Sequence, residues 1–153
     1  MDINKRLKDL GISLPVAPAP AASYVPFLRA DEFLFIAGQV PMLNGETHYV
    51  GRLGESLSVE QGAAAARMCG VNILAQVSAA LDGDLNRVIG CVRLGGFVNA
   101  TPGFTDHPKV INGASDLMIE VFGDLGRHAR AAVGVSSLPR GVGVEIDAIF
   151  RVC

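Results

Sequence analysis

Apolar and polar residues alternate most regularly near the end of the chain. Every even-numbered position of 142–152 is apolar, and the odd-numbered positions between them include Glu145. Residues 129–135 alternate in the same way, with Arg130 in the set that also contains alanine and glycine. An alternation of period two is typical of β-strands that bury one face. We therefore predict two closing strands, joined as a hairpin by a turn at 138–141.

Two longer stretches repeat their apolar residues at helical spacing. Ser58 with Gln61 has the signature of a capping box, and Asp106 followed by Pro108 is typical of a helix start. The apolar stripes behind these starts are Ala66, Gly70, Ile73, Leu74, Val77 and Leu81, and Val110, Ala114, Leu117, Met118, Val121 and Leu125. We therefore predict two long amphipathic helices. A short N-terminal helix, ending at Gly11, precedes them.

The remaining segments predict an extended arm and two more strands. Residues 15–26 form a proline-punctuated arm that carries Tyr24. Residues 33–40 are apolar on both alternating sets, which is typical of a strand covered on both faces. Residues 88–98 are rich in β-formers but interrupted by glycine, which indicates a curved strand. Strands that enclose two amphipathic helices predict an α+β sandwich, with the helices on one sheet face. The other face then needs a different cover, which a neighbouring subunit could provide.

Length and composition indicate how many domains the protein has and which kinds of partner it binds. A chain of 153 residues fits one domain, 1–153, in which 1–23 are the N-terminal helix and the first part of the arm. Half of the residues are apolar, only 18% are charged, and the mean hydropathy is +0.37, so we expect an extensive subunit interface. The formal net charge is −2 and no Lys/Arg cluster occurs, so we expect no nucleic-acid partner.

The sequence predicts a cytoplasmic protein without a metal. No run approaches the roughly 18 consecutive apolar residues of a membrane span, and charges interrupt the start of the chain, where a signal peptide needs an apolar core. The cysteines are far apart, which indicates reduced thiols and no disulfide framework. The three histidines are equally scattered and fit no metal-ligand spacing.

Arg130 and Glu145 are the candidate functional side chains. In a hairpin that turns at 138–141, Arg130 lies opposite Ile149, and Glu145 lies about 13 Å further along the same face at ~3.3 Å per residue. An ion pair within one chain is therefore disfavoured, and each residue is expected to meet a partner across a subunit boundary. A guanidinium among small residues is suited to a carboxylate ligand. For Glu145, positioning of a water molecule and structural pairing are both open.

The chain closely resembles the RidA/YjgF family. The motifs that carry the resemblance are Ala129-Arg130, Leu138-Pro139 and Val144-Glu145-Ile146, with FIAGQVP at 35–41 upstream. The resemblance extends over nearly the whole chain from Tyr24 onwards, and the spacing of fifteen residues from Arg130 to Glu145 matches (145 − 130 = 15). The N-terminal extension, the longer loop at 97–107 and the segment Asn112-Gly113-Ala114-Ser115 resemble those of a less characterised branch.

The resemblance implies a chorismate-mutase-like fold and a homotrimer with clefts between subunits. It also implies hydrolysis of reactive enamines and imines, formed by pyridoxal-phosphate enzymes, to 2-oxo acids and ammonia. This reaction needs no cofactor. By motif match, Arg130 binds the carboxylate of a small metabolite and Glu145 positions the water. The residues implied to line the cleft are Tyr24, Ala37, Gly38, Phe104 and Asn112.

Two departures from the family pattern keep alternatives open. Ala37 replaces a common serine, and Ala132 replaces a frequent cysteine. The first alternative is a non-catalytic module that binds a small carboxylate or a partner protein, which needs Arg130 but not Glu145. The second is the ribonuclease or translation-inhibitor activity also attributed to the family, for which the sequence offers no basic face and no histidine pair.

Overall fold

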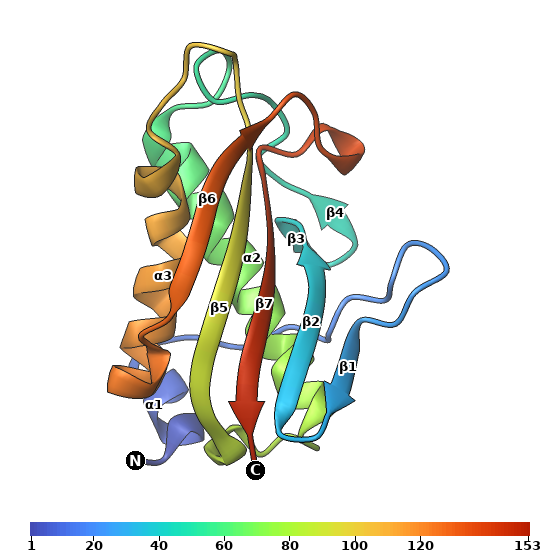
Figure 1. Ribbon diagram of the computed structural model, residues 1–153, viewed down its shortest axis with the longest axis vertical. Helices are drawn as coiled ribbons and strands as arrows, with labels where there is room; N and C mark the ends of the chain where they lie inside the picture. The colour runs from blue at the N-terminus through green and yellow to red at the C-terminus, as the bar shows by residue number, and fades with distance from the viewer.

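A mixed β-sheet carries two long helices on one of its faces (Figure 1). The computed structural model describes every residue from Met1 to Cys153. In chain order the elements are α1 (Ile3–Asp9), β1 (Phe27–Ala30), β2 (Phe33–Gln39), β3 (Met42–Leu43), β4 (Glu46–Thr47), α2 (Val59–Ala80), η1 (Leu85–Arg87), β5 (Val88–Asn99), α3 (His107–Phe122), η2 (Gly123–Gly126), β6 (Ala129–Val135), η3 (Pro139–Gly141) and β7 (Val144–Val152). Five strands form the main sheet in the order β1–β2–β7–β5–β6, and β3 pairs with β4 alone. The predicted α+β class is confirmed.

The helices begin where the sequence predicts. Ser58 Oγ accepts a hydrogen bond from the backbone N–H of Gln61 at 3.1 Å, and Gln61 Oε1 accepts one from the N–H of Ser58 at 2.8 Å, so the capping box before α2 is confirmed. Asp106 precedes α3 as expected, but its carboxylate does not cap the helix and lies 3.5 Å from Lys109 Nζ instead. In α1, Ile3 and Leu7 are buried.

Small residues allow α2 and α3 to pack closely. A Cβ atom added at Gly70 would lie 2.8 Å from Leu117 Cδ2, and one added at Gly113 would overlap the carbonyl oxygen of Ala63. The helix axes are therefore as close as their backbones permit. This contact fixes α3 above β5 and β6, and so fixes the position of every side chain on its sheet-facing side.

The pairing of the closing strands differs from the predicted hairpin. The turn itself forms, because the N–H of Gly141 donates to the carbonyl of Leu138 at 3.0 Å. However, β6 does not pair with β7; β5 lies between them, parallel to β6 and antiparallel to β7 (Figure 1). The segment after β6 therefore crosses the end of β5, and the predicted hairpin is wrong.

This pairing places Arg130 and Glu145 on opposite faces of the sheet. Arg130 lies opposite Leu94 of β5, which lies opposite Ala148 of β7. Leu94 and Ala148 are buried beneath the helices, so Arg130 belongs to the helix-covered face. Glu145 lies opposite Phe97 and alternates with the buried residues of β7, so it belongs to the other, open face. The predicted placement of both residues on the same face of the sheet is therefore wrong.

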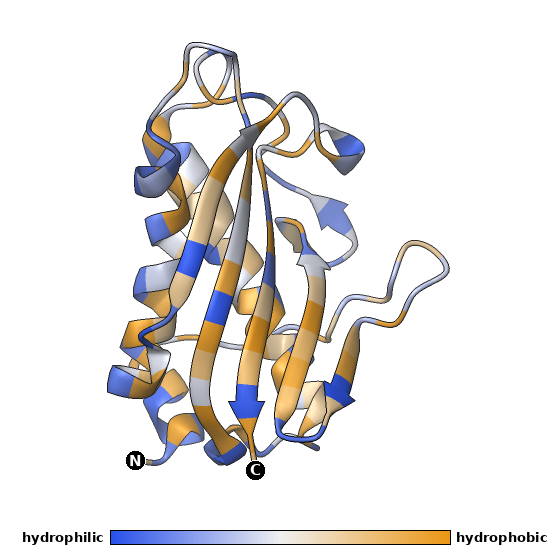
Figure 2. Ribbon diagram, viewed as in Figure 1, coloured by the Kyte–Doolittle hydropathy of each residue, from blue (hydrophilic) through white to orange (hydrophobic).

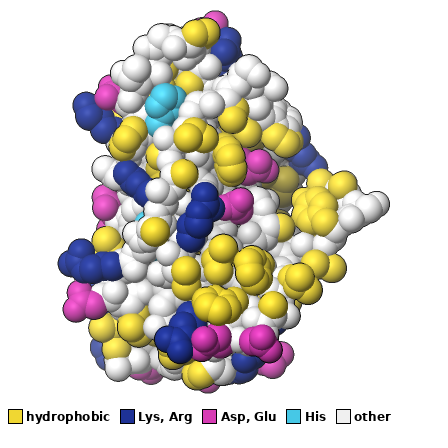
Figure 3. Space-filling model, in the orientation of Figure 1, with side chains coloured by type: hydrophobic (Ala, Val, Ile, Leu, Met, Phe, Trp, Pro, Cys, Tyr) yellow, Lys and Arg dark blue, Asp and Glu magenta, His cyan; other side chains and the backbone are white.

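The open face of the sheet carries exposed apolar side chains. Leu28 on β1, Phe35 on β2 and Val133 on β6 are 60%, 42% and 45% exposed. Figure 2 shows largely hydrophobic strands, and Figure 3 shows hydrophobic atoms gathered over this face around a few charged ones. The predicted burial of 33–40 on both faces is thus not reached within one chain, since alternate residues of β2 stay exposed. The sequence also did not predict β1.

The N-terminal arm connects the two edges of the molecule. It leads from α1 across to β1 (Figure 1). Gln76 of α2 donates through Nε2 to the carbonyl of Pro18 at 2.7 Å, which attaches the arm to the helix layer. None of the helices has both the length and the apolar character needed to cross a bilayer.

We expect Gly113→Ala to destabilise the fold by about 1–3 kcal/mol, because the new methyl group overlaps backbone that can move only with α2. This loss outweighs the roughly 1 kcal/mol that alanine gains over glycine within a helix. Urea unfolding measures the difference. Gly103→Ala is the matched control, since its Cβ meets nothing within 4 Å. Equal stability of the two variants would contradict the close helix contact.

Candidate functional site

The structure separates the predicted site residues into two groups. Tyr24, Gly38 and Glu145 line one cavity, and Ala37 precedes Gly38 on β2. Arg130 instead contacts α3, the helix that carries Asn112. Phe104 lies just before α3 and lines a second, smaller pocket. No single chain therefore brings all seven residues together.

The two groups are far apart within one subunit. The strand β5 separates β6 from β7, and neighbouring strands are about 4.8 Å apart. Glu145 is also three residues along β7 from Ala148, which shares a row with Arg130. The two Cα positions are therefore roughly 14 Å apart, on opposite sheet faces. No ion pair joins the two side chains, as expected, although the predicted reason, a hairpin register, was incorrect.

A β-bulge in β2 creates the space that Glu145 occupies. Between the pairs Ile36–Ala148 and Gln39–Ile146, β2 has two residues where β7 has only Asp147. The bulge turns Gly38 toward Glu145, so that an added Cβ would lie 3.0 Å from Glu145 Cδ. The close approach that glycine permits at position 38 is therefore made by the Glu145 side chain.

The environment of Glu145 favours its protonated form. Burial raises the pKa of this carboxyl group, and the nearby charge of Asp147 raises it further. Burial also raises the pKa of Asp147, although Arg93 and a hydrogen bond from the Gly95 backbone act in the opposite direction. No protein group donates a hydrogen bond to the side-chain carboxylate of Glu145. Its carboxylate oxygens are therefore available to water or to a ligand.

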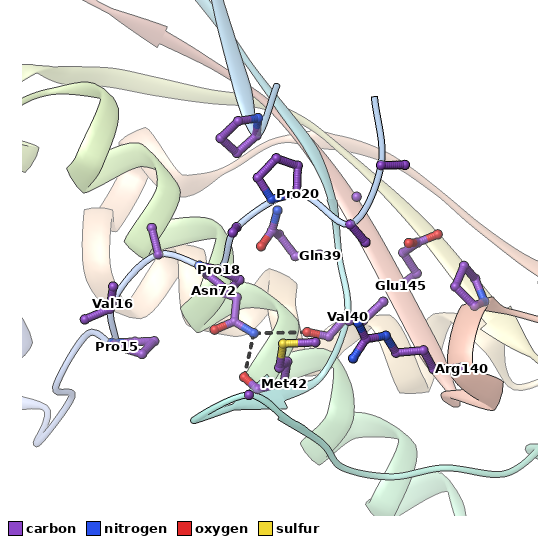
Figure 4. Close-up of a pocket in the computed structure, with 18 of the residues that line it drawn as sticks. Pro15, Val16, Pro18, Pro20, Gln39, Val40, Met42, Asn72, Arg140 and Glu145 are labelled. Carbon is purple, nitrogen blue, oxygen red and sulfur yellow. Dashed lines mark hydrogen bonds between the residues drawn. The ribbon is translucent and has the colours of Figure 1, made fainter. Parts of the chain in front are cut away.

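Glu145 faces a cavity of about 870 Å³ between the arm, the sheet and the β2–β3 connection. Asn72 of α2 fixes the backbone of the β2–β3 connection in the cavity wall, because its Nδ2 donates to the carbonyls of Val40 at 3.0 Å and Met42 at 2.9 Å (Figure 4). Sequence reasoning did not identify Asn72 or Gln76. A signal was present, because both are polar residues next to the apolar stripe of α2 and both are almost fully buried. Buried amides of this kind need partners, and here the partners are loop carbonyls.

Arg140 is a further residue that sequence reasoning missed. It lines the same cavity, and its backbone has φ 59° and ψ 13° in η3. The left-handed conformation costs a non-glycine residue about 1–2 kcal/mol. The N–H of Gly51, donating to the Gly141 carbonyl at 2.9 Å, helps to hold this turn in place.

A polar cluster holds Arg130. One guanidinium nitrogen donates to Ser115 Oγ at 3.0 Å and the other to the Pro108 carbonyl at 3.3 Å. Ser115 Oγ also lies 2.8 Å from His128 Nε2, and His128 Nδ1 lies 2.7 Å from the Gly126 carbonyl. Because Nδ1 faces an acceptor, it carries the proton; Ser115 therefore donates to Nε2 and accepts from Arg130. The cluster orients the guanidinium without neutralising its charge.

The weaker candidates lie on the Arg130 side of the molecule. Asn112 is exposed on α3, one turn before Ser115. Phe104 packs edge-to-face on His107, with ring centroids 5.2 Å apart, in a pocket of about 390 Å³ that also contains Arg52. Neither residue reaches the Glu145 cavity of its own chain.

Residues 4–142 match the model of the family described as "YjgF/chorismate mutase-like, putative endoribonuclease". The chain belongs to this family. Within the YjgF family, Protein TCP17 of Trypanosoma cruzi is 49% identical over 146 residues, which are 95% of this chain and 91% of that protein. The predicted family and the chorismate-mutase-like fold are thereby confirmed.

Two solved structures of high similarity also match. Protein Atu1372 of Agrobacterium tumefaciens, of unknown function, is 48% identical with a TM-score of 0.92, over 99% of this chain and 92% of that one. A Shewanella oneidensis protein described as a "putative endoribonuclease" is 33% identical with a TM-score of 0.95, over 99% of this chain and 100% of that one. Both matches include nearly all of the N-terminal extension, as expected of a separate branch of the YjgF family.

More distant relatives show how far the YjgF fold extends. MMF1 of Saccharomyces cerevisiae, a protein named as mitochondrial, is 28% identical over 138 residues, 90% of this chain and 81% of that protein. TdcF of E. coli, solved with bound serine, is 19% identical with a TM-score of 0.64, over 90% and 94%, which is a likeness of fold alone. The cytoplasmic location of this chain therefore stays a prediction.

We expect Glu145→Gln to stabilise the subunit in a pH-dependent way. The raised pKa means that Glu145 supports the fold fully below its ordinary value of 4.5 and loses this contribution as pH rises through the raised value. Glutamine does not ionise and escapes the loss. The Tm of the variant should therefore equal that of the wild type at acid pH and exceed it at pH 8. Glu55→Gln, at an exposed position, controls for the lost charge; a pH-independent difference would contradict the assignment.

Proposed function

We propose that this YjgF-family protein hydrolyses reactive 2-imino acids, and the 2-enamines from which they form, to 2-oxo acids and ammonia. The oxygen of a water molecule bonds to the imine carbon while a carboxylate takes the proton of that water. The carboxylate passes that proton to the nitrogen. The new hydroxyl group then gives its own proton to the nitrogen as the carbonyl forms, the C–N bond breaks and ammonia leaves. One imine and one water thus give one 2-oxo acid and one ammonia, without an oxidant or a cofactor.

The observation that carries this proposal is the half-buried carboxylate of Glu145 in a large cavity. A base is most effective when its pKa approaches the working pH, and burial raises the pKa of Glu145 in that direction. Because no protein donor occupies its oxygens, they can bind the attacking water. Arg130 would bind the substrate carboxylate through a bidentate pair of hydrogen bonds and so orient the imine carbon.

The separation of Arg130 from Glu145 favours a cleft shared by two subunits. A small imino acid cannot span roughly 14 Å and pass through the sheet, so the two residues act together only if they come from different copies. The exposed apolar residues of the open face, such as Phe35, provide a surface that a neighbour could bury. We therefore propose the homotrimer with three inter-subunit clefts that the family resemblance implies.

The remaining predicted residues divide between the two halves of this proposed cleft. Tyr24 and Gly38 would line the Glu145 half, and the Gly38 N–H would serve as a donor. Asn112 and Phe104 would line the Arg130 half, contributed by the neighbour. With alanine at 37, this cleft lacks the serine hydroxyl common in the family, so backbone donors carry more of the recognition.

Binding without catalysis is the second candidate, and two observations favour it. The hydroxyl is absent at Ala37, and TdcF holds serine, a small molecule with a carboxylate. A binding module would need Arg130 and would ignore Glu145. Ribonuclease activity, which the family description names, is less favoured because the net charge is −2 and the Glu145 cavity has a single cationic side chain.

A coupled assay tests the reaction. A serine or threonine dehydratase generates the imine, and its decay is followed with and without the protein. Glu145→Gln should lower the rate by about 10²–10⁴-fold, as loss of a general base does, and Arg130→Gln by about 10²-fold or more. The wild-type rate should rise with pH as Glu145 ionises. Arg29→Gln, at an exposed position on β1 that lines neither pocket, should retain full activity. Wild-type decay no faster than buffer would exclude catalysis on these substrates.

Subunit mixing tests the shared cleft. Arg130→Gln and Glu145→Gln chains, each inactive alone, are mixed in equal amounts under conditions of subunit exchange. In a cyclic trimer, random mixing gives about one quarter of the clefts an intact residue from each side. Recovery of about a quarter of wild-type activity is therefore expected. Confirmed hybrid trimers without recovered activity would show that the residues do not meet across the boundary.

A further inference from the structure

Arg140 differs from every other arginine of the chain in having no partner. The chain has ten arginines, and the side chains of the other nine each donate a hydrogen bond to a carbonyl, a hydroxyl or a carboxylate. Arg140 makes neither a side-chain hydrogen bond nor an ion pair. Its guanidinium therefore retains all of its donors.

This unpartnered guanidinium lies in the wall of the Glu145 cavity. Among the twenty residues that line the cavity, Arg140 is the only cation and Glu145 the only anion. Figure 4 shows the Arg140 side chain extending from η3 toward Val40, on the same side of the cavity as Glu145. The two charges do not neutralise each other, because no hydrogen bond or ion pair joins them and the pKa of Glu145 is raised rather than lowered.

The backbone at Arg140 also argues for a role of its side chain. Its φ of 59° suits glycine, and Gly141 beside it has φ 69°, so the turn could be made without a side chain at either position. An arginine at a strained position, pointing at a cavity and bound to nothing, is suited to meet a ligand.

The rest of the cavity indicates how large and how polar that ligand is. A volume of about 870 Å³ is near the upper end of the range of ~300–1,000 Å³ for ligand pockets. The walls are mainly proline and alanine from the arm, with the amides of Gln39 and Asn72 already bonded to carbonyls. A ligand with an anionic group at one end would pair the free guanidinium, whereas a purely apolar tail would bury it unpaired.

We propose that Arg140 makes the site selective for dicarboxylic 2-imino acids by binding the distal carboxylate of the substrate. The assignment rests on the proposed function: the imine carbon lies at Glu145, and the 2-carboxylate is bound by Arg130 of the neighbouring subunit. Arg140 thus sets which acid enters, while Arg130 accepts any 2-imino acid. The product of the reaction would be a 2-oxo dicarboxylic acid.

Binding of two 2-oxo acids tests this assignment. 2-Oxoglutarate and 2-oxopentanoate share one carbon chain and differ only in the terminal carboxylate or methyl group. Titration calorimetry at fixed ionic strength should give about tenfold or tighter binding of 2-oxoglutarate to the wild-type protein. Arg140→Gln should reduce this preference to within about twofold and leave the affinity for 2-oxopentanoate unchanged. Arg29→Gln removes the same charge from an exposed position on β1 and should retain the preference.

Several outcomes would overturn the proposal. Equal affinity of the wild type for both acids, binding of neither acid, or an unchanged preference in Arg140→Gln would each remove Arg140 from substrate selection. If Arg140→Gln weakened the binding of both oxo acids equally, Arg140 would instead be assigned to the 2-carboxylate that the two acids share.

Failure of the proposed function gives a different pattern. In that case neither the dehydratase-derived imine nor 2-iminoglutarate, generated from glutamate by an amino-acid oxidase, decays faster with the protein, although 2-oxoglutarate still binds in preference and Arg140→Gln still abolishes the preference. Conversely, turnover of a monocarboxylic imine combined with equal binding of the two oxo acids rejects only the role of Arg140. The two experiments therefore separate selection from catalysis.

Discussion

The position of β5 between β6 and β7 decides where the functional side chains of the sheet lie. Parallel pairing on one side and antiparallel pairing on the other place Arg130 in a row with Leu94, under the helices. Glu145, on the far strand, falls on the open face. A bulge at Val92 contributes, because Cys91 and Arg93 would otherwise share a face; the bulge shifts the rest of β5 by one position. A slip of one residue would exchange every side chain between the two faces.

Local features of the fold could be predicted from the sequence, and strand pairing could not. The capping box of Ser58 and the apolar stripes identified both long helices, because these signals lie within a few residues of each other. The hairpin error arose because alternation in 129–135 and 142–152 says nothing about which strand lies alongside. One signal was available: β5, α3 and β6 follow one another as strand, helix and strand, an order that commonly joins parallel neighbours.

The arrangement of the candidate site was even harder to predict from the sequence than the strand pairing, because it depends on tertiary contacts. Arg130 and Glu145 stood out as charges among small residues, but the partners Ser115 and His128 became evident only when α3 was placed over β6. The raised pKa of Glu145 has the same origin, because it results from burial beside β2 and from the charge of a neighbouring side chain. Arg140 was hidden in a turn whose unusual backbone no composition rule indicates.

The bulge in β2 has an evolutionary consequence. Gly38 and Glu145 are in close contact, because an added Cβ at position 38 would lie 3.0 Å from Glu145 Cδ and the carboxyl group would have to shift by a few tenths of an ångström. Position 38 can therefore gain a bulky side chain only if the acid at 145 shortens or turns away. Relatives of this protein are expected to change the two positions together, and a relative with a bulky residue at 38 is expected to have moved its acid elsewhere. The size of the residue at position 38 in a relative would then indicate whether that relative keeps an acid at position 145.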